Sequence, residues 1–125
     1  MKIFLSSLLI LVLTITGGVM ADSYLSNVAK EIDEYCKTIS ELPQESEEVY
    51  KKAYNEMNEY WQNKKKTLSV IIDHAYIGDI DKALSEMEAA INTDEHGEMF
   101  LSLARIKTTI DMVAQNEHFH LNSIL

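Results

Sequence analysis

Several polar side chains in this chain are of the types that bind metal ions, and one group of them is arranged as in a calcium-binding loop. Asn92, Asp94 and His96 alternate before Gly97, as the oxygen ligands and the turn glycine do in such a loop. The loop needs a bidentate Glu at its twelfth position, where this chain has Leu103. A histidine at the fifth position is also a poor ligand for a hard cation. We therefore predict no calcium site.

A second group lies near the C-terminus, where His118 and His120 follow Glu117 and where Asp111 lies one or two helical turns earlier. Imidazole and carboxylate groups are suitable zinc ligands. Alternate residues of a helix point in different directions, so the two imidazoles converge only if the tail is extended. Surface histidines in an acidic protein need no metal to explain them, and we predict neither a metal ion nor a cofactor.

His74 is the histidine best placed for chemistry, because it shares a helical face with Val70, Ile71 and Ile77. A buried, neutral imidazole there would be satisfied by a carboxylate such as Asp73. The chain has no phosphate-binding glycine loop, nucleophile elbow or zinc-protease helix, and no motif places a nucleophile beside this histidine. We predict a structural role for His74 and no enzymatic activity.

Cys36 is the single cysteine, so no disulfide can form within one chain. Its spacing from Ile32 and Ile39 places it on an apolar helical stripe, where a free cysteine packs as a small hydrophobic residue. We predict that it is part of the core. The alternative is an intermolecular disulfide in an oxidising compartment.

The elements that position these residues are helices, because apolar residues recur at intervals of three and four along most of the chain. No stretch has the strict alternation of a strand. The predicted helices cover residues 25–42, then from Pro43 or Gln44 to Gly78, then 80–91 with Asp79 as the cap, and then 99–113 with an extension toward Glu117. We predict an all-α fold of about four antiparallel helices, a bundle or stacked hairpins, after an N-terminal hydrophobic helix.

The long second helix carries Tyr54, Tyr60 and Trp61, and their role depends on its length. If this helix extends beyond its shorter neighbours, these aromatic side chains offer a surface for a partner. If it does not, they pack on the first helix. The closing residues, with Leu121 and Asn122 among them, are apolar for a chain end and predict a tail that docks.

The N-terminal segment predicts export. Lys2 precedes an apolar run, and small side chains at Val19 and Ala21 suit cleavage by signal peptidase. The stretch is also about nineteen residues long, roughly 28 Å as a helix, which is close to the thickness of the bilayer core. Residues 1–21 are therefore a signal peptide or a membrane anchor, and residues 22–125 form one extracytoplasmic domain, anchored or secreted.

Composition excludes some partners. The chain has 20 acidic against 11 basic side chains and a net charge of -9. Such a protein is repelled by the phosphates of nucleic acids and by anionic lipid headgroups, so we expect no nucleic-acid partner.

The chain as a whole resembles a bacterial family known as domain of unknown function 4363. The likeness consists of an N-terminal hydrophobic segment, a long helix with a tryptophan, a histidine near the end of that helix, and a Leu-rich tail with an asparagine. The residues that carry it are Trp61, Leu68, His74, Ile77, Leu103 and 121–125. Ser123 departs from the usual tail. The family has no established activity to transfer. Its genes are sometimes neighbours of small multi-pass membrane proteins, which implies a membrane partner.

These observations predict an exported, membrane-associated helical protein that acts by protein–protein interaction, with a membrane protein or a second copy as its partner. The alternative is a module that binds a small ligand or a metal in the interior near His74. An enclosed polar cavity around this histidine would favour the ligand-binding module, and a dry packed contact would favour the interaction protein.

Overall fold

The structure, a computed structural model, describes the backbone of residues 2–43 and 47–124, and the side chains of these residues as far as Gln115. This part of the chain forms four helices and no strand, which confirms the predicted all-α fold. The helices are α1 (Lys2–Ser40), α2 (Glu47–Ile71), α3 (His74–Asn92) and α4 (His96–Ile124).

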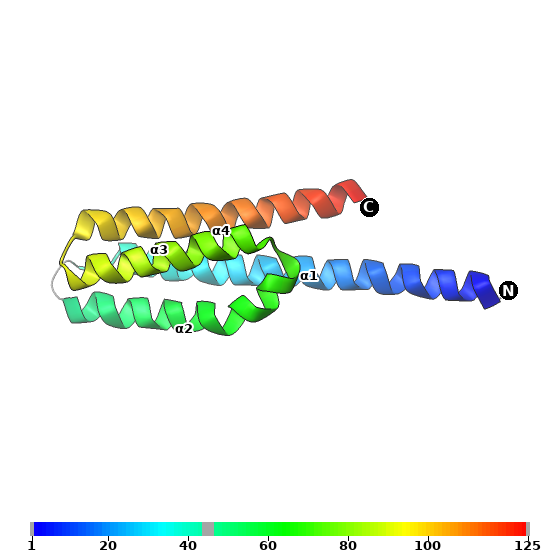
Figure 1. Ribbon diagram of the computed structural model, residues 1–125, viewed down its shortest axis with the longest axis horizontal. Coiled ribbons are helices and arrows are strands. Elements are labelled where there is room, and N and C mark those ends of the chain that lie inside the picture. The colour runs from blue at the N-terminus through cyan, green and yellow to red at the C-terminus, as the bar shows by residue number, and fades with distance from the viewer. Residues whose placement is uncertain (1, 44–46, 125) are drawn as a thin grey trace.

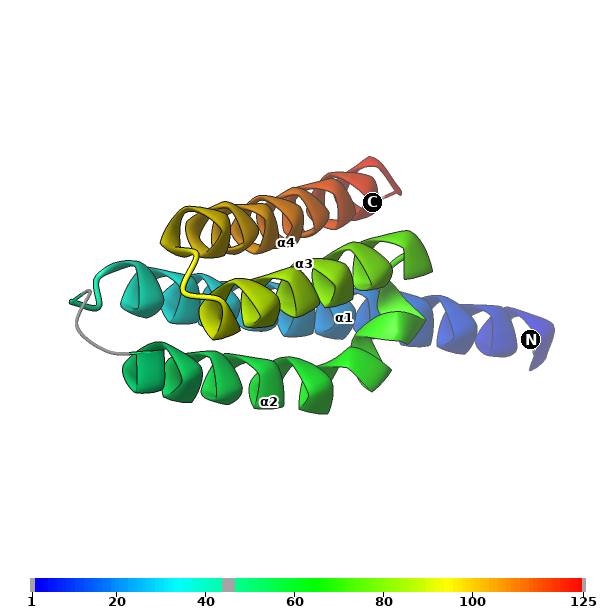
Figure 2. The same ribbon diagram turned by 60° about the vertical axis from the view of Figure 1, so that its left-hand side comes forward.

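The helices form an antiparallel four-helix bundle (Figures 1 and 2). Each helix packs on the helix that follows it in the chain, and α1 packs on α4 to close the ring. The N-terminal half of α1 extends beyond the bundle, and the C-terminal end of α4 lies on the same side (Figure 1). Short connections favour this arrangement because they join each helix to an antiparallel neighbour.

The apolar stripes of the four helices meet in one core. Its largest buried side chains include Trp61 and Tyr50 from α2, Ile32 from α1, Met87 from α3 and Ile106 from α4. These residues lie on the stripes that the three- and four-residue spacing identifies. The helical period in the sequence therefore predicts the inward face of each helix.

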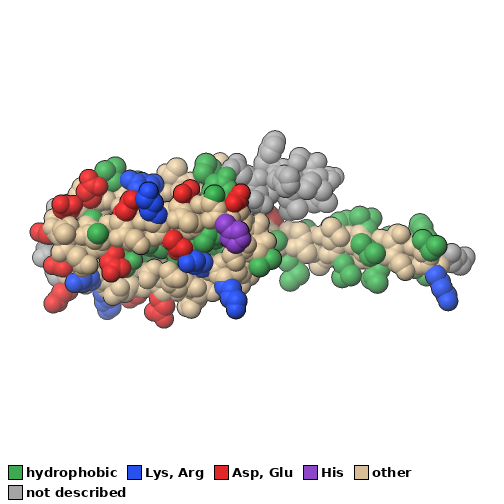
Figure 3. All heavy atoms as spheres, viewed as in Figure 1, with side chains coloured by type: hydrophobic (Ala, Val, Ile, Leu, Met, Phe, Trp, Pro, Cys, Tyr) green, Lys and Arg blue, Asp and Glu red, His purple; other side chains and the backbone are tan. Residues whose placement is uncertain are grey.

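α1 is one continuous helix, whereas the sequence predicted a separate N-terminal helix followed by another over 25–42. The residues between the two predicted helices contain no proline, and Gly17 and Gly18 lie within α1. A glycine lowers helix stability by about 1 kcal/mol without ending the helix, so nothing interrupts α1 before the bundle. On the face shown in Figure 3, the projecting half of α1 carries apolar side chains, and charged side chains are scattered over the bundle.

The boundary between α2 and α3 lies at Ile72 and Asp73, and the predicted boundary at Gly78 is wrong. Asp73 has extended backbone angles, and its carboxylate accepts a hydrogen bond of 3.0 Å from the N–H of Ala75, as a helix N-cap does. Gly78 lies inside α3, and a Cβ added to it would contact nothing within 4 Å. Its lack of a side chain is therefore not needed there, and Asp79 is an ordinary residue within the helix.

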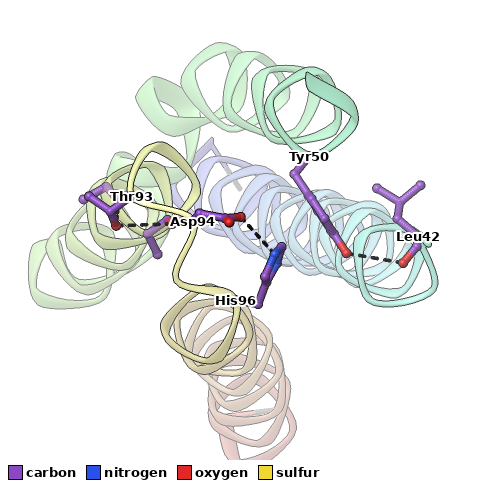
Figure 4. Close-up of polar contacts among 7 residues, drawn as sticks. Leu42, Tyr50, Thr93, Asp94 and His96 are labelled. Carbon is purple, nitrogen blue, oxygen red and sulfur yellow. Dashed lines mark hydrogen bonds and ion pairs between the residues drawn. The ribbon is translucent and has the colours of Figure 1, made fainter. Parts of the chain in front are cut away.

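The connection between α3 and α4, residues 93–95, lies within the turn-forming stretch that the sequence identified. Asp94 has a φ of 58°, a left-handed conformation that Asp adopts more readily than most residues. Its carboxylate pairs with Nε2 of His96 at 3.0 Å, and the Tyr50 hydroxyl donates to the carbonyl of Leu42 at 3.4 Å (Figure 4). Two residues of the loop that resembles a calcium site therefore pair with each other at this end of the bundle.

A groove between helices α1 and α4 as the candidate functional site

The aromatic side chains of α2 do not form the exposed surface that one of our two predictions described. Trp61 is fully buried, and its indole N–H donates a hydrogen bond of 2.8 Å to Oδ1 of Asp81 on α3. Oδ2 of Asp81 lies 2.7 Å from Nζ of Lys65. Tyr54 is also buried, and its hydroxyl donates to Glu88 of α3 at 3.1 Å. Burial, together with Glu88, raises the pKa of Tyr54. These contacts join α2 to α3, so Tyr54 and Trp61 are structural.

Tyr60 is half-buried and packs on α1, as the other prediction required. Its ring centroid lies 5.5 Å from that of Tyr35, and Nζ of Lys64 lies 5.7 Å from the Tyr60 ring and 5.8 Å from the Tyr24 ring. Burial raises the pKa of Tyr60 to about 12, with a smaller contribution from Glu31. Tyr60 therefore contacts α1, the helix that we expected.

His74 is exposed, so the prediction that it is buried beside Val70, Ile71 and Ile77 is wrong. The cause is the break at residues 72 and 73, because His74 begins α3 and no longer continues the apolar face of α2. The sequence alone did not reveal this break. An exposed side chain at a helix start offers neither the enclosed polar cavity nor the packed contact that would distinguish the two predicted functions.

The side chains of Leu121 and Asn122 lie outside the described residues, although the backbone of α4 continues past both as a helix. The docking of the tail therefore stays a prediction. The same holds for the imidazoles of His118 and His120. Among the described side chains, no three His, Cys, Asp or Glu residues are close enough together to hold a metal ion.

A groove of about 740 Å³ runs between α1 and α4. Small side chains at Ala29, Ala104 and Ala114 leave this space where the two helices meet, and Phe100 and Leu103 add apolar surface. The remaining lining residues are Ser26, Lys30, Asp33, Glu34, Cys36, Lys37, Ser40 and Lys107. The groove thus combines an apolar floor with charged edges, an arrangement that suits an amphipathic partner.

Cys36 contributes to the floor of the groove and is 3% exposed, which confirms the prediction that it packs in the core. Its Sγ lies 4.0 Å from the carbonyl oxygen of Leu103, to which the thiol donates. Burial is the main cause that raises the thiol's pKa, to about 12. The group therefore stays protonated at neutral pH and is a poor nucleophile.

At the edge of the groove, one ammonium group forms ion pairs with two carboxylates. Nζ of Lys107 lies 3.0 Å from Oδ2 of Asp111, one turn along α4, and 3.5 Å from Oδ1 of Asp33 on α1. The geometry leaves this buried Oδ1 without a hydrogen bond. Burial is the first cause, and Asp111 the second, that raise the pKa of Asp33 to about 6, while Lys107 lowers it. The two carboxylates raise the pKa of Lys107.

The sequence patterns do not identify this cluster, although they include Asp111 among the possible metal ligands. Asp33 and Asp111 are far apart in the chain. No sequence motif predicts that Lys107 contacts both of them and so joins the two helices. The spacing of Lys107 and Asp111 by four residues was the available signal, because such pairs face each other on a helix. The participation of Asp33 follows only from the packing of α1 on α4.

Comparison with known proteins identifies a family. The family model described as "Domain of unknown function (DUF4363)" matches residues 19–124, which is most of the chain. This match confirms the resemblance seen in the sequence. It covers the bundle and leaves the first seventeen residues of α1, 2–18, outside. No curated protein and no solved structure matches the chain.

Proposed function

The chain belongs to the DUF4363 family, and we propose that it is a membrane-anchored helical protein that works outside the cytoplasm by binding a helical partner in the α1–α4 groove. A non-catalytic role is part of this proposal. The family description carries no activity, so the support comes from the structure of α1 and from the character of the groove.

The observation that carries the proposal is the bare apolar half of α1. Its most apolar stretch has a mean hydropathy of 2.3, and none of it is buried against the rest of the described chain. Within the described residues, α1 is the helix that is long and apolar enough to cross a membrane. Water is an unfavourable environment for such a continuous apolar surface, and lipid is a favourable one.

The unbroken course of α1 favours an anchor over a cleaved signal peptide. Ala21 and Asp22 are half-buried where α1 enters the bundle, and the helix continues through both without a turn. Cleavage after Ala21 would require this segment to leave the helix. Lys2 and the amino terminus favour the cytoplasmic side, which places the bundle on the other side of the membrane.

The groove supports a role in protein–protein interaction. Helical partners bind grooves of this kind through apolar anchors spaced three and four residues apart. The groove lies along α1, so it stands upright when α1 spans the membrane, and a partner helix anchored in the same membrane meets it side by side. Acidic side chains elsewhere on the bundle favour solubility.

Fractionation of cells that express the full chain tests the anchor. We expect the protein in the membrane pellet after alkaline extraction, with its N-terminus intact and its bundle open to protease added outside the cytoplasm. A variant with Leu9→Arg and Val12→Arg should leave the membrane, because each arginine at the centre of a spanning helix costs about 3 kcal/mol.

The matched control places two arginines at exposed positions of α2, Asn55→Arg and Gln62→Arg, and should stay in the membrane. A mature protein that begins at Asp22 in the medium would show that the segment is a cleaved signal. A bundle that stays inside the cytoplasm would exclude the proposed location.

A further inference from the structure

The proposed anchor restricts how two copies of this chain can meet. Because the same α1 segment lies in the membrane in each copy, both bundles stand parallel and at the same height. A closed pair then has a two-fold axis parallel to the helices. We call the height of a residue along the helix axis its level. A residue of α1 in one copy then lies opposite the residue of α4 in the other copy that has the same level, so the structure of one chain determines the register of the pair.

Two contacts within one chain define these levels. Asp33 lies level with Lys107, whose Nζ is 3.5 Å away, and Cys36 lies level with Leu103, whose carbonyl oxygen is 4.0 Å away. The two helices are antiparallel and have the same rise per residue. Lys30 therefore lies level with residues 109–110 of α4, and Glu34 lies level with residues 105–106.

Charges at these levels are complementary across the pair. Lys30 and Glu34 are exposed on the groove edge of α1. Along α4, Asp111 lies one or two residues, roughly 1.5–3 Å, from the level of Lys30. Lys107 lies at the same distance from the level of Glu34, and long side chains can bridge this difference. Two parallel copies that place α1 against the partner's α4 therefore bring opposite charges together at both levels, and symmetry provides each pair twice.

The charged cluster in the groove has two carboxylates and one ammonium group, so it is one positive charge short of neutrality. Asp33 and Asp111 share the single ammonium group of Lys107, and Oδ1 of Asp33 is buried without a hydrogen bond. Lys30 makes no ion pair with another described residue. Lys30 of the partner subunit would bring the missing charge and neutralise the cluster.

Apolar surface beside the groove supports the same contact. Leu101, Ala104, Thr108 and Met112 follow each other along α4 at intervals of three and four residues, so they share one face. All four are exposed, and the exposed fraction is 57% for Leu101 and 43% for Met112. Ala104 also lines the groove, and its small side chain allows a second helix to approach closely.

From these observations we propose that the groove binds a second copy of this chain, with α1 of each copy packed against α4 of the other and Lys30 paired with the partner's Asp111. This inference rests on the proposed function, because the anchor supplies the parallel orientation and the common height. Anchoring also raises the effective concentration of the copies, so a modest interface is enough to hold the pair.

Sedimentation equilibrium of the full chain in density-matched detergent tests the pairing. We expect the wild type to form dimers and Lys30→Glu to weaken them about tenfold or more, because it places like charges together on both sides of the axis. Combining Lys30→Glu with Asp111→Lys should restore the dimer. Lys52→Glu is the matched control, since it changes the net charge equally at an exposed position on α2 and should leave the dimer intact.

Cysteine crosslinking in membranes provides a second measurement that does not depend on reversing charges. A chain with Lys30→Cys, co-expressed with a chain that has Asp111→Cys, should give a covalent dimer on mild oxidation. Lys52→Cys co-expressed with Asp111→Cys should not. The native Cys36 is buried and does not contribute.

A wild type that stays monomeric, a Lys30→Glu dimer as tight as wild type, or the absence of the Lys30→Cys crosslink would overturn the proposed pairing. These results are separate from a failure of the proposed function. A monomer that stays in the membrane pellet leaves the anchor in place, whereas a protein found in the soluble fraction removes it.

Discussion

Replacing Asp33 by Asn should stabilise the bundle above pH 6 and leave its stability unchanged near pH 4. The pKa of Asp33 is about 6 in the folded chain, against an ordinary value of 3.8. Between these two values the folded state binds more protons than the unfolded state. The free energy of unfolding therefore falls as the pH rises from about 4 to about 6, and above that pH the loss is constant.

The size of the effect follows from this difference in pKa. A shift of this size corresponds to at most about 3 kcal/mol for a fully desolvated group. The Asp33 side chain is 31% exposed, and screening by water reduces the expected gain to about 1 kcal/mol. For a domain of this size, 1 kcal/mol raises the melting temperature by about 4–8 °C. Asn keeps the shape of the side chain, and Lys107 keeps its contact with Asp111.

Thermal unfolding followed by circular dichroism measures the effect, in dilute detergent solution where the copies are separate. The melting temperatures of wild type and Asp33→Asn should coincide near pH 4 and diverge by pH 7. Glu34→Gln is the control, because it removes a neighbouring exposed charge outside the Lys107 cluster and should show no such divergence. A variant that is less stable than wild type at pH 8, or a difference that is equal at pH 4 and pH 8, would refute the reasoning.

Four further predictions concern the core and the helix ends. Trp61→Phe should lower the free energy of unfolding by about 2 kcal/mol in urea titrations, because it removes buried volume and the hydrogen bond to Asp81; an unchanged midpoint would contradict the burial of the indole. Asp73→Ala should cost about 1 kcal/mol through the lost N-cap, and Gly78→Ala should gain up to about 1 kcal/mol because this position is helical and open. A destabilising Gly78→Ala would instead place the turn at residue 78. Cys36 should react with a thiol reagent only after denaturation, because its pKa is about 12 and its side chain is buried; fast labelling of the native chain would show that the groove opens.

The helical period in the sequence correctly predicted which residues form the core. Ile32, Cys36 and Ile39 of α1 and Ile106 of α4 are buried on the faces that this spacing identifies. The period is local, since it depends on residues within one or two turns, and it can be identified before any tertiary contact is known.

The ends of the helices were harder to predict, because local signals compete there. Gly78 and Asp79 have the residue types of a turn and a cap, whereas Asp73 has only the residue type of a cap and follows the apolar residues Ile71 and Ile72. The structure breaks the helix at the earlier of these positions. Ile72 and Ile77 are both buried on either side of the break, so the packing of α2 against α3 favours it.

The sequence by itself determined the helical class, the inward face of each helix and the apolar segment that extends from the bundle, because each of these depends on residues that are near neighbours in the chain. Only the tertiary structure decided that Trp61 bonds to Asp81 and that Asp33 shares Lys107 with Asp111. The physical reason is that such contacts depend on the rotation and register of one helix against another. These are properties of the packed bundle, and no spacing within a single helix specifies them.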